Sequence, residues 1–200
     1  MPVVAWAACV VAYLVGSIPS AVVVARRHGV DIRAVGDRNP GWWNTQATLG
    51  KRSAVPVFVV DAAKGLVAGG LGHLVAGGRW WVPYVVVGAA MVGHAWPVFA
   101  SFRGGRCVLT LVGGFVAIAP IAALVTLLVC VALWGVTRRF EWFARSGVFG
   151  FPVVQAVFDP LVHVAATGAL MSFVGFRFAQ AALSGRRGAG HAGLHHEKPS

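Results

Sequence analysis

The sequence has little charge, and very little of it is negative. Only 12% of its 200 residues are Asp, Glu, Lys or Arg, and only six are acidic. Soluble domains usually carry about 25% charged residues and about 45–50% apolar residues. Here 58% of the residues are apolar. The shortage of charge excludes a disordered chain and an ordinary cytosolic enzyme, and it indicates an integral membrane protein of one domain.

Cysteine is also scarce, and its placement indicates neither disulfides nor a metal site. The three cysteines lie apart in apolar runs, which is typical of small buried side chains. Three histidines near the C-terminus, at positions 191, 195 and 196, are an alternative metal-binding set. Histidines in a polar tail are more often solvated, so the sequence predicts no metal and no other cofactor.

Three long apolar runs come first in the chain. Val3–Ala25 contains no charged residue and is long enough to cross a bilayer core of about 30 Å. The runs over residues 53–76 and 82–100 follow, and both carry polar groups that are discussed below. Each run predicts one transmembrane helix.

Two further apolar runs are too long for a single span. Residues 107–136 contain no charged residue. Residues 148–176 contain one, Asp159. Proline is a probable helix boundary, so we expect one run to divide near Pro120 and the other near Pro160. The sequence therefore predicts an all-α, polytopic membrane protein with about seven short or tilted transmembrane helices.

The basic residues predict the orientation of these helices. With both divisions, 15 of the 17 Lys and Arg residues fall on one side of the membrane. Cytoplasmic loops collect Lys and Arg, so we expect the N-terminus outside and the C-terminus inside. This reading explains most of the net charge of +11 without nucleic acid. Residues 1–178 are expected to form the membrane domain, and residues 179–200 a disordered, basic and His-containing cytoplasmic tail.

Two polar segments on the predicted cytoplasmic side are candidates for function. Gly36–Thr45 is a loop rich in Gly, Asn and Pro, although turn chemistry alone also explains it. In the second segment, Arg103 and Arg106 bracket Gly104 and Gly105 just before a predicted helix. Glycines let backbone N–H groups approach an anion, and the arginines add charge, so we favour a phosphate site there. A turn with ordinary positive-inside arginines is the alternative.

Charged groups at membrane depth are the third candidate. Asp61 and Lys64 are one helical turn apart in an apolar run, and His94 lies in the next run. Such groups usually pair or line a polar cavity. The pair can be structural, or Lys64 can join His94 and add positive charge for an anionic ligand. Together the three candidates predict an anion-binding pocket at the membrane boundary, reached by a phosphorylated substrate from water and by a lipid from the bilayer.

Four motifs in this order resemble the bacterial acyl-phosphate:glycerol-3-phosphate acyltransferase family, of which the chain looks like a divergent member. They are YLVGSIPSA (Tyr13–Ala21), VDIRAVGDRNPGWWNTQATLGK (Val30–Lys51), DAAKG (Asp61–Gly65) and GHAWPVFASFRGGRCVLT (Gly93–Thr110). The resemblance implies a multi-pass enzyme of the bacterial plasma membrane that moves an acyl chain from acyl phosphate to glycerol 3-phosphate, without a metal. The product would be lysophosphatidic acid, in phospholipid synthesis.

The resemblance also implies which residues bind the phosphorylated substrates. By position these are Asn39, Asn44, Lys64, His94, Arg103, Gly104, Gly105, Arg106 and Thr110. No catalytic nucleophile is implied.

The sequence departs from the family pattern at several positions. Asp37 stands where the family has Ser, Ala47 where it has Arg, and Cys107 where it has Gly. The family's C-terminal signature has no clear counterpart. These departures leave open a second hypothesis, a catalytically impaired relative that binds a phosphorylated metabolite or an anionic lipid. A small transporter is a third hypothesis, weakened by the lack of an internal repeat.

Overall fold

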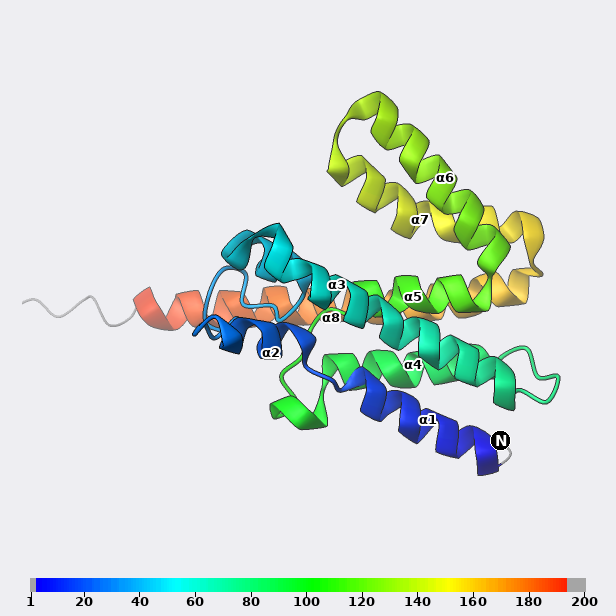
Figure 1. Ribbon diagram of the computed structural model, residues 1–200, viewed down its shortest axis with the longest axis horizontal. Coiled ribbons are helices and arrows are strands. Elements are labelled where there is room, and N and C mark those ends of the chain that lie inside the picture. Colours follow the sequence, from blue (N-terminus) through cyan, green and yellow to red (C-terminus); the bar gives the residue numbers. More distant parts are fainter. Residues whose placement is uncertain (1–2, 194–200) are drawn as a thin grey trace, which may run out of the picture.

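The computed structural model describes residues 3–193 and shows a bundle built only of helices in this range (Figure 1). The helices are α1 (Val3–Gly16), α2 (Ser20–Arg27), α3 (Trp42–Val75), α4 (Val82–Ala95), the short 3-10 helix η1 (Val98–Ala100), α5 (Val108–Ile118), α6 (Pro120–Thr137), α7 (Phe140–Phe158) and α8 (Leu161–Gly193).

Both predicted proline boundaries are confirmed. α5 ends at Ile118, and Pro120 is the first residue of α6, where its missing N–H costs nothing. α7 ends at Phe158, and Asp159 takes an extended conformation because a residue before proline disfavours the helical region. The two long apolar runs are therefore two helices each.

The structure corrects the boundaries of two other segments. The first predicted span is broken between α1 and α2, at residues 17–19. The loop expected over Gly36–Thr45 ends earlier, because Trp42–Thr45 already belongs to α3. α3 is itself kinked at Gly50, whose φ of 82° and ψ of 169° are not helical. Glycine tolerates this positive φ because it has no Cβ. The predicted span began only at residue 53, because nothing in the polar sequence before it indicated a helix.

The helices match the membrane class predicted from the sequence. Five segments are long and apolar enough to cross a bilayer, and two shorter apolar helices, Val108–Ile118 and Ser146–Phe158, lie beside them. Successive segments run back and forth, so the N-terminal end of α1 and the C-terminal end of α8 lie at opposite ends of the bundle (Figure 1). The all-α, polytopic fold is confirmed, while the predicted orientation with the N-terminus outside stays a prediction.

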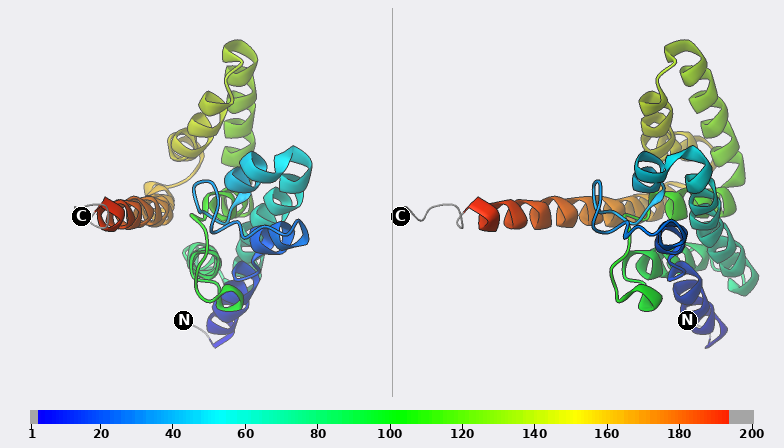
Figure 2. Two further views of the ribbon diagram at one scale, coloured as in Figure 1. Left: turned by 90° about the vertical axis from the view of Figure 1, so that its left-hand side faces the viewer. Right: turned by 60° about the vertical axis from the view of Figure 1, so that its left-hand side comes forward.

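The α6–α7 hairpin stands apart from the other helices. In both views of Figure 2 it leaves the bundle, and α6 packs mainly on α7. At its base, the buried ring of Phe151 on α7 stacks on Phe115 of α5, with ring centroids 3.9 Å apart. The hairpin is thus attached to the bundle near one end only.

Helix α8 crosses the bundle and is attached by a buried polar network. Gln155 of α7 donates to the Tyr84 hydroxyl at 3.2 Å, and Thr167 of α8 donates to Gln155 at 2.7 Å. Hydrogen bonds of this kind satisfy polar groups in a bundle that has no water to solvate them. α8 continues to Gly193, past position 179, where the tail was expected to begin, and residues 194–200 of that tail lie outside the described range.

Glycines allow the closest helix contacts. A Cβ at Gly113 of α5 would lie 1.9 Å from the Ala62 carbonyl oxygen of α3, and one at Gly65 of α3 would lie 1.8 Å from the Thr110 carbonyl oxygen. α1 and α4 show the same reciprocal pattern through Gly16 and Gly93. Small residues at such contacts let membrane helices approach closely enough for dispersion and weak polar contacts to hold them.

We expect Gly113→Ala to destabilise the protein by about 1–3 kcal/mol, because the added methyl group forces α3 and α5 apart. Thermal unfolding in detergent measures the change. The matched control is Gly70→Ala on α3, where nothing lies within 4 Å of the added Cβ. That variant should be neutral or slightly more stable. Equal losses in the two variants would contradict the proposed role of close packing.

Candidate functional site

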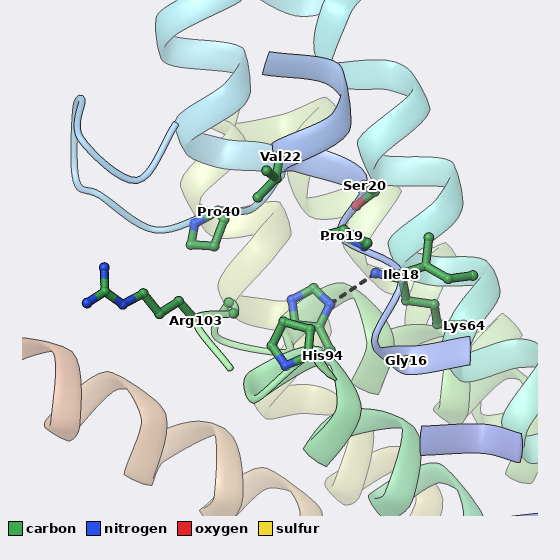
Figure 3. Close-up of a pocket in the computed structure, with 12 residues that line it drawn as sticks. Gly16, Ile18, Pro19, Ser20, Val22, Pro40, Lys64, His94 and Arg103 are labelled. Atoms are coloured by element: carbon green, nitrogen blue, oxygen red, sulfur yellow. Dashed lines mark hydrogen bonds between the residues drawn. The ribbon is translucent and has the colours of Figure 1, made fainter. Parts of the chain in front are cut away.

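Four polar side chains from three parts of the chain meet in the interior. Asp61 on α3 accepts hydrogen bonds from Ser20 at 2.6 Å and from Lys64 at 2.7 Å, both at Oδ1. Lys64 Nζ lies 3.4 Å from Nδ1 of His94 on α4, the contact dashed in Figure 3. Asp61 and Lys64 are 1% and 2% exposed, and His94 is 8% exposed. The predicted meeting of Lys64 with His94 is therefore present, together with the pairing of Lys64 with Asp61.

The cluster is held together because its charges compensate one another. A buried ion costs several kcal/mol in desolvation unless it is paired and hydrogen-bonded. Here the carboxylate faces one ammonium and one hydroxyl, so neither charge is left alone. Thr110 of α5 donates to the backbone oxygen of Asp61 at 3.1 Å, which adds a fourth helix to the cluster. The structure thus uses the Thr110 hydroxyl to join two helices.

The glycines between the two arginines serve close packing. The N–H of Gly104 donates to the Ala95 carbonyl oxygen at 3.2 Å, and the N–H of Gly105 donates to that of His94 at 3.1 Å. A Cβ at Gly104 would lie 2.0 Å from the His94 oxygen, and one at Gly105 would lie 2.5 Å from His94 Nε2. Both N–H groups cap the last carbonyls of α4 and hold the loop against His94. Substrate binding by the two glycines stays a prediction.

Arg177 of α8 completes this cap. Its guanidinium donates to the carbonyl oxygens of Ala95, Gly104 and Gly105 at 3.3 Å and lies over the Trp96 ring, 4.9 Å from the centroid. A cation is favoured at a helix C-terminus, where the last carbonyls carry partial negative charge. Arg177 thereby ties α8 to the loop that borders the site.

The two arginines of the loop diverge. Arg103 is exposed, and its guanidinium extends away from His94 (Figure 3). Arg106 pairs with Asp37, with Nη1 2.9 Å from Oδ2, and lies over the Phe178 ring at 4.8 Å. They therefore offer charge on two sides of the loop and do not converge on one point.

The two asparagines differ in their surroundings. Asn44 is 2% exposed, and its Nδ2 donates to the carbonyl oxygens of Ile32 and Val35 at 2.9 and 3.0 Å. Its side chain therefore shapes the loop that precedes α3. Asn39 is partly exposed and borders the large cavity described below. Both remain predicted substrate ligands, and the surroundings favour Asn39 for direct contact.

Backbone strain gathers in the two loops around the site. Among the described residues, four of the five non-glycine residues with positive φ lie there, namely Arg38, Ser101, Phe102 and Cys107. Each costs about 1–2 kcal/mol, and such strain tends to occur at functional sites. Cys107, at φ 65°, is buried, and its thiol donates to the Met91 carbonyl oxygen at 3.2 Å.

A small pocket of about 10 Å³, called the polar pocket after its Lys64, His94 and Arg103 side chains, and a large apolar cavity share His94 in their linings. The pocket is lined by Ser20, Pro40, Lys64, His94 and Arg103, among others (Figure 3). The cavity has a volume of about 840 Å³ and reaches from Asp37, Asn39 and Arg106 to side chains of α3, α5, α6 and α7. Several of its apolar lining residues are exposed, among them Val112, Val116, Leu124 and Leu127 at 37–58%. The cavity is therefore open, and its exposed wall along α5 and α6 is apolar.

Sequence reasoning missed Ser20 and Arg177. Ser20 lies within the SIPS segment, where nothing marked it as the partner of Asp61. Arg177 had a usable signal, since it interrupts the apolar run of α8 and charged groups at membrane depth usually have a partner. It was counted only among the 15 basic residues that predict the orientation, and no partner was sought for it.

Fold and site together define an integral, multi-pass membrane protein in which polar and basic groups border a large apolar cavity. Residues 6–183 match the family model described as glycerol-3-phosphate acyltransferase. The chain belongs to this family, as its motifs predicted.

Individual relatives support the assignment. The glycerol-3-phosphate acyltransferase 2 of Moorella thermoacetica is 44% identical over 130 residues, which cover 63% of this chain and 64% of that protein. The match thus spans less than two thirds of that relative's length. Two crystal structures of PlsY (YgiH), an integral membrane glycerol 3-phosphate acyltransferase, have the same fold. The glycerol 3-phosphate form gives a TM-score of 0.76 at 30% identity and the lysophosphatidic acid form 0.73 at 28%, each covering 91% of this chain and 93% of that chain.

We expect Lys64→Ala to destabilise the protein by about 3–5 kcal/mol, because it leaves the buried carboxylate of Asp61 without a counter-ion. Thermal unfolding in detergent measures the loss. Arg33→Ala is the control, since it breaks an exposed pair with Asp31 of 3.2 Å that is worth at most about 1 kcal/mol. A loss in Lys64→Ala no larger than in the control would show that the buried pair is not what holds the cluster.

Arg177→Ala should cost about 1–3 kcal/mol, because three carbonyl oxygens lose a charged donor. Arg177→Lys keeps the charge but loses the planar fork that reaches several oxygens at once, so it should recover only part of the loss. Thermal unfolding midpoints of the parent protein and the two variants, measured in one detergent, test the expected order of stability. An alanine variant as stable as the parent would mean that the cap on α4 does not depend on α8.

Proposed function

We propose that the chain transfers an acyl group from acyl phosphate to glycerol 3-phosphate and so forms lysophosphatidic acid, in phospholipid synthesis. The observation that carries the proposal is the position of His94, which lines both the polar pocket and the apolar cavity. An acyl phosphate has its reactive carbonyl carbon where an apolar chain meets a phosphate. A chain in the cavity would place that carbon near His94, at the junction of the two spaces.

The reaction needs charge neutralisation and positioning more than a protein nucleophile, because the donor is already activated. The glycerol hydroxyl oxygen forms a bond to the carbonyl carbon, and the bond from that carbon to the phosphate oxygen breaks. Arg106 and Arg103 supply positive charge on the two sides of the loop. Lys64 has three donors, of which Asp61 and His94 account for two, and it borders the polar pocket.

The contact with Lys64 suggests what His94 does. An ammonium can only donate, so we assign Nδ1 of His94 as the acceptor and place the ring proton on Nε2. In this tautomer His94 is a hydrogen-bond donor at the junction and not a base. The hydroxyl proton would then leave with the released phosphate, which is itself a proton acceptor near neutral pH.

The relatives support the choice of substrates. The two PlsY structures are described as the glycerol 3-phosphate form and the lysophosphatidic acid form, which correspond to the proposed acceptor and product. Acyl phosphate as donor, and the bacterial plasma membrane as location, rest on the motif resemblance. No nucleic acid or cofactor enters the proposal.

A second function, binding of a phosphorylated metabolite or anionic lipid without turnover, is favoured by one observation. Asp37 places a carboxylate on Arg106, one of the predicted phosphate ligands. A binding protein would show a phosphate-dependent rise in melting temperature and no product.

The decisive experiment mixes purified protein with acyl phosphate and labelled glycerol 3-phosphate. We expect labelled lysophosphatidic acid, and a loss of at least about tenfold in the Arg103→Ala, Arg106→Ala double variant, because two cations that oppose the phosphate charge are gone. Product no greater than that of the double variant would refute acyl transfer. A ligand-induced rise in melting temperature would then support the binding function.

A further inference from the structure

One predicted phosphate ligand already holds an anion from its own chain. Arg106 Nη1 lies 2.9 Å from Asp37 Oδ2, and the other carboxylate oxygen, Oδ1, accepts the N–H of Asn39 at 3.1 Å. The pair joins the loop before α3 to the start of α5. Its side chains are 24% and 38% exposed, so water and a soluble ligand reach both.

The pair lies where a phosphate group is expected. Asp37, Asn39 and Arg106 all line the large cavity, whose remaining walls are mainly apolar apart from polar side chains such as Asp61 and His94. Arg106 Nε is buried and has no hydrogen-bond partner among the described residues. A guanidinium carries five donors and binds carboxylate and phosphate by the same fork. The site thus has the donors for an anion, and a carboxylate occupies part of them.

We propose that Asp37 sets the affinity for the phosphorylated substrate, because its carboxylate neutralises Arg106 in the free protein and must be displaced when a phosphate group binds. This inference rests on the proposed function for the identity of the ligand. Asp37 acts through Arg106 and takes no part in bond making.

The charges of Asp37, Arg106 and the phosphate determine whether removing the Asp37 charge strengthens or weakens phosphate binding. Carboxylate and phosphate compete for one guanidinium, and a carboxylate displaced by only a few ångströms still repels a phosphate that carries up to two negative charges. The pair is partly exposed, so it is worth at most about a few-fold in an equilibrium constant. Removing the charge should therefore tighten phosphate binding without altering the reacting groups.

The test uses Asp37→Asn and Asp37→Ser in the full-length protein. If Arg106 holds the phosphate of glycerol 3-phosphate, we expect the Kd for that substrate to fall about two- to fivefold. If it holds the phosphate of acyl phosphate, we expect the same decrease in the KM for that donor. The rate constant kcat should change less than about twofold, because the substitution acts on binding. Measuring the two substrates separately identifies the phosphate that binds Arg106, and no decrease for either substrate would overturn the proposal.

Two further variants isolate the Asp37–Arg106 contact. Asp31→Asn removes the same charge from the same loop, where Asp31 pairs with Arg33 outside the cavity lining, and should leave both constants unchanged. In an Arg106→Gln background, Asp37→Asn should tighten binding less, since the coupling between the two residues is lost and only the direct repulsion is relieved. An equal gain in Asp31→Asn, or an undiminished gain without Arg106, would refute the proposal.

The binding measurement also separates this inference from the proposed function. If the parent protein makes no lysophosphatidic acid, acyl transfer fails as the function. Calorimetric binding of inorganic phosphate to the parent and to Asp37→Asn still decides the role of Asp37. Tighter binding in the variant supports that role, and equal or weaker binding, with equal melting temperatures of the two free proteins, contradicts it.

Discussion

The buried ion pair between Asp61 and Lys64 is the interaction on which the rest of the structure depends. Its carboxylate accepts the Ser20 hydroxyl from α2, its ammonium touches His94 of α4, and its backbone oxygen accepts Thr110 of α5. In an interior of low polarity, four elements must keep their places for both charges to stay compensated. The same requirement keeps a lysine and a histidine beside the polar pocket, so stability and the site share one set of contacts.

The glycines make these contacts possible. Gly65 and Gly113 bring α3 against α5, and Gly104 and Gly105 bring their loop against the end of α4. A side chain at any of these positions would separate backbones that now lie in contact, and the polar groups would lose their partners. Arg177 then closes the arrangement from α8, since its donors meet the carbonyl oxygens that the loop leaves available. The close helix contacts at the glycines and the hydrogen bonds of the buried polar groups therefore depend on each other.

Features encoded by local chemistry were predictable from the sequence. Apolar run length and Pro120 gave the spans and their divisions, and the cost of charge in lipid marked Lys64 as a residue with a partner. Features set by packing between distant segments were not predictable. The sequence predicted neither the hydrogen bonds of Asn44 to the loop carbonyls nor those of the glycine N–H groups to α4. Nothing in the spacing of these residues shows which surface another helix will cover.

The apolar, exposed wall of the large cavity has a consequence for the path of the proposed lipid substrate. Moving one methylene from hydrocarbon into water costs about 0.8 kcal/mol, so an acyl chain that detoured through water would face a barrier growing with every carbon. Lining residues such as Val116 and Leu127 are apolar and exposed, so an acyl chain that entered past them would stay among apolar groups. Chain length then has little effect on how fast a lipid enters or leaves.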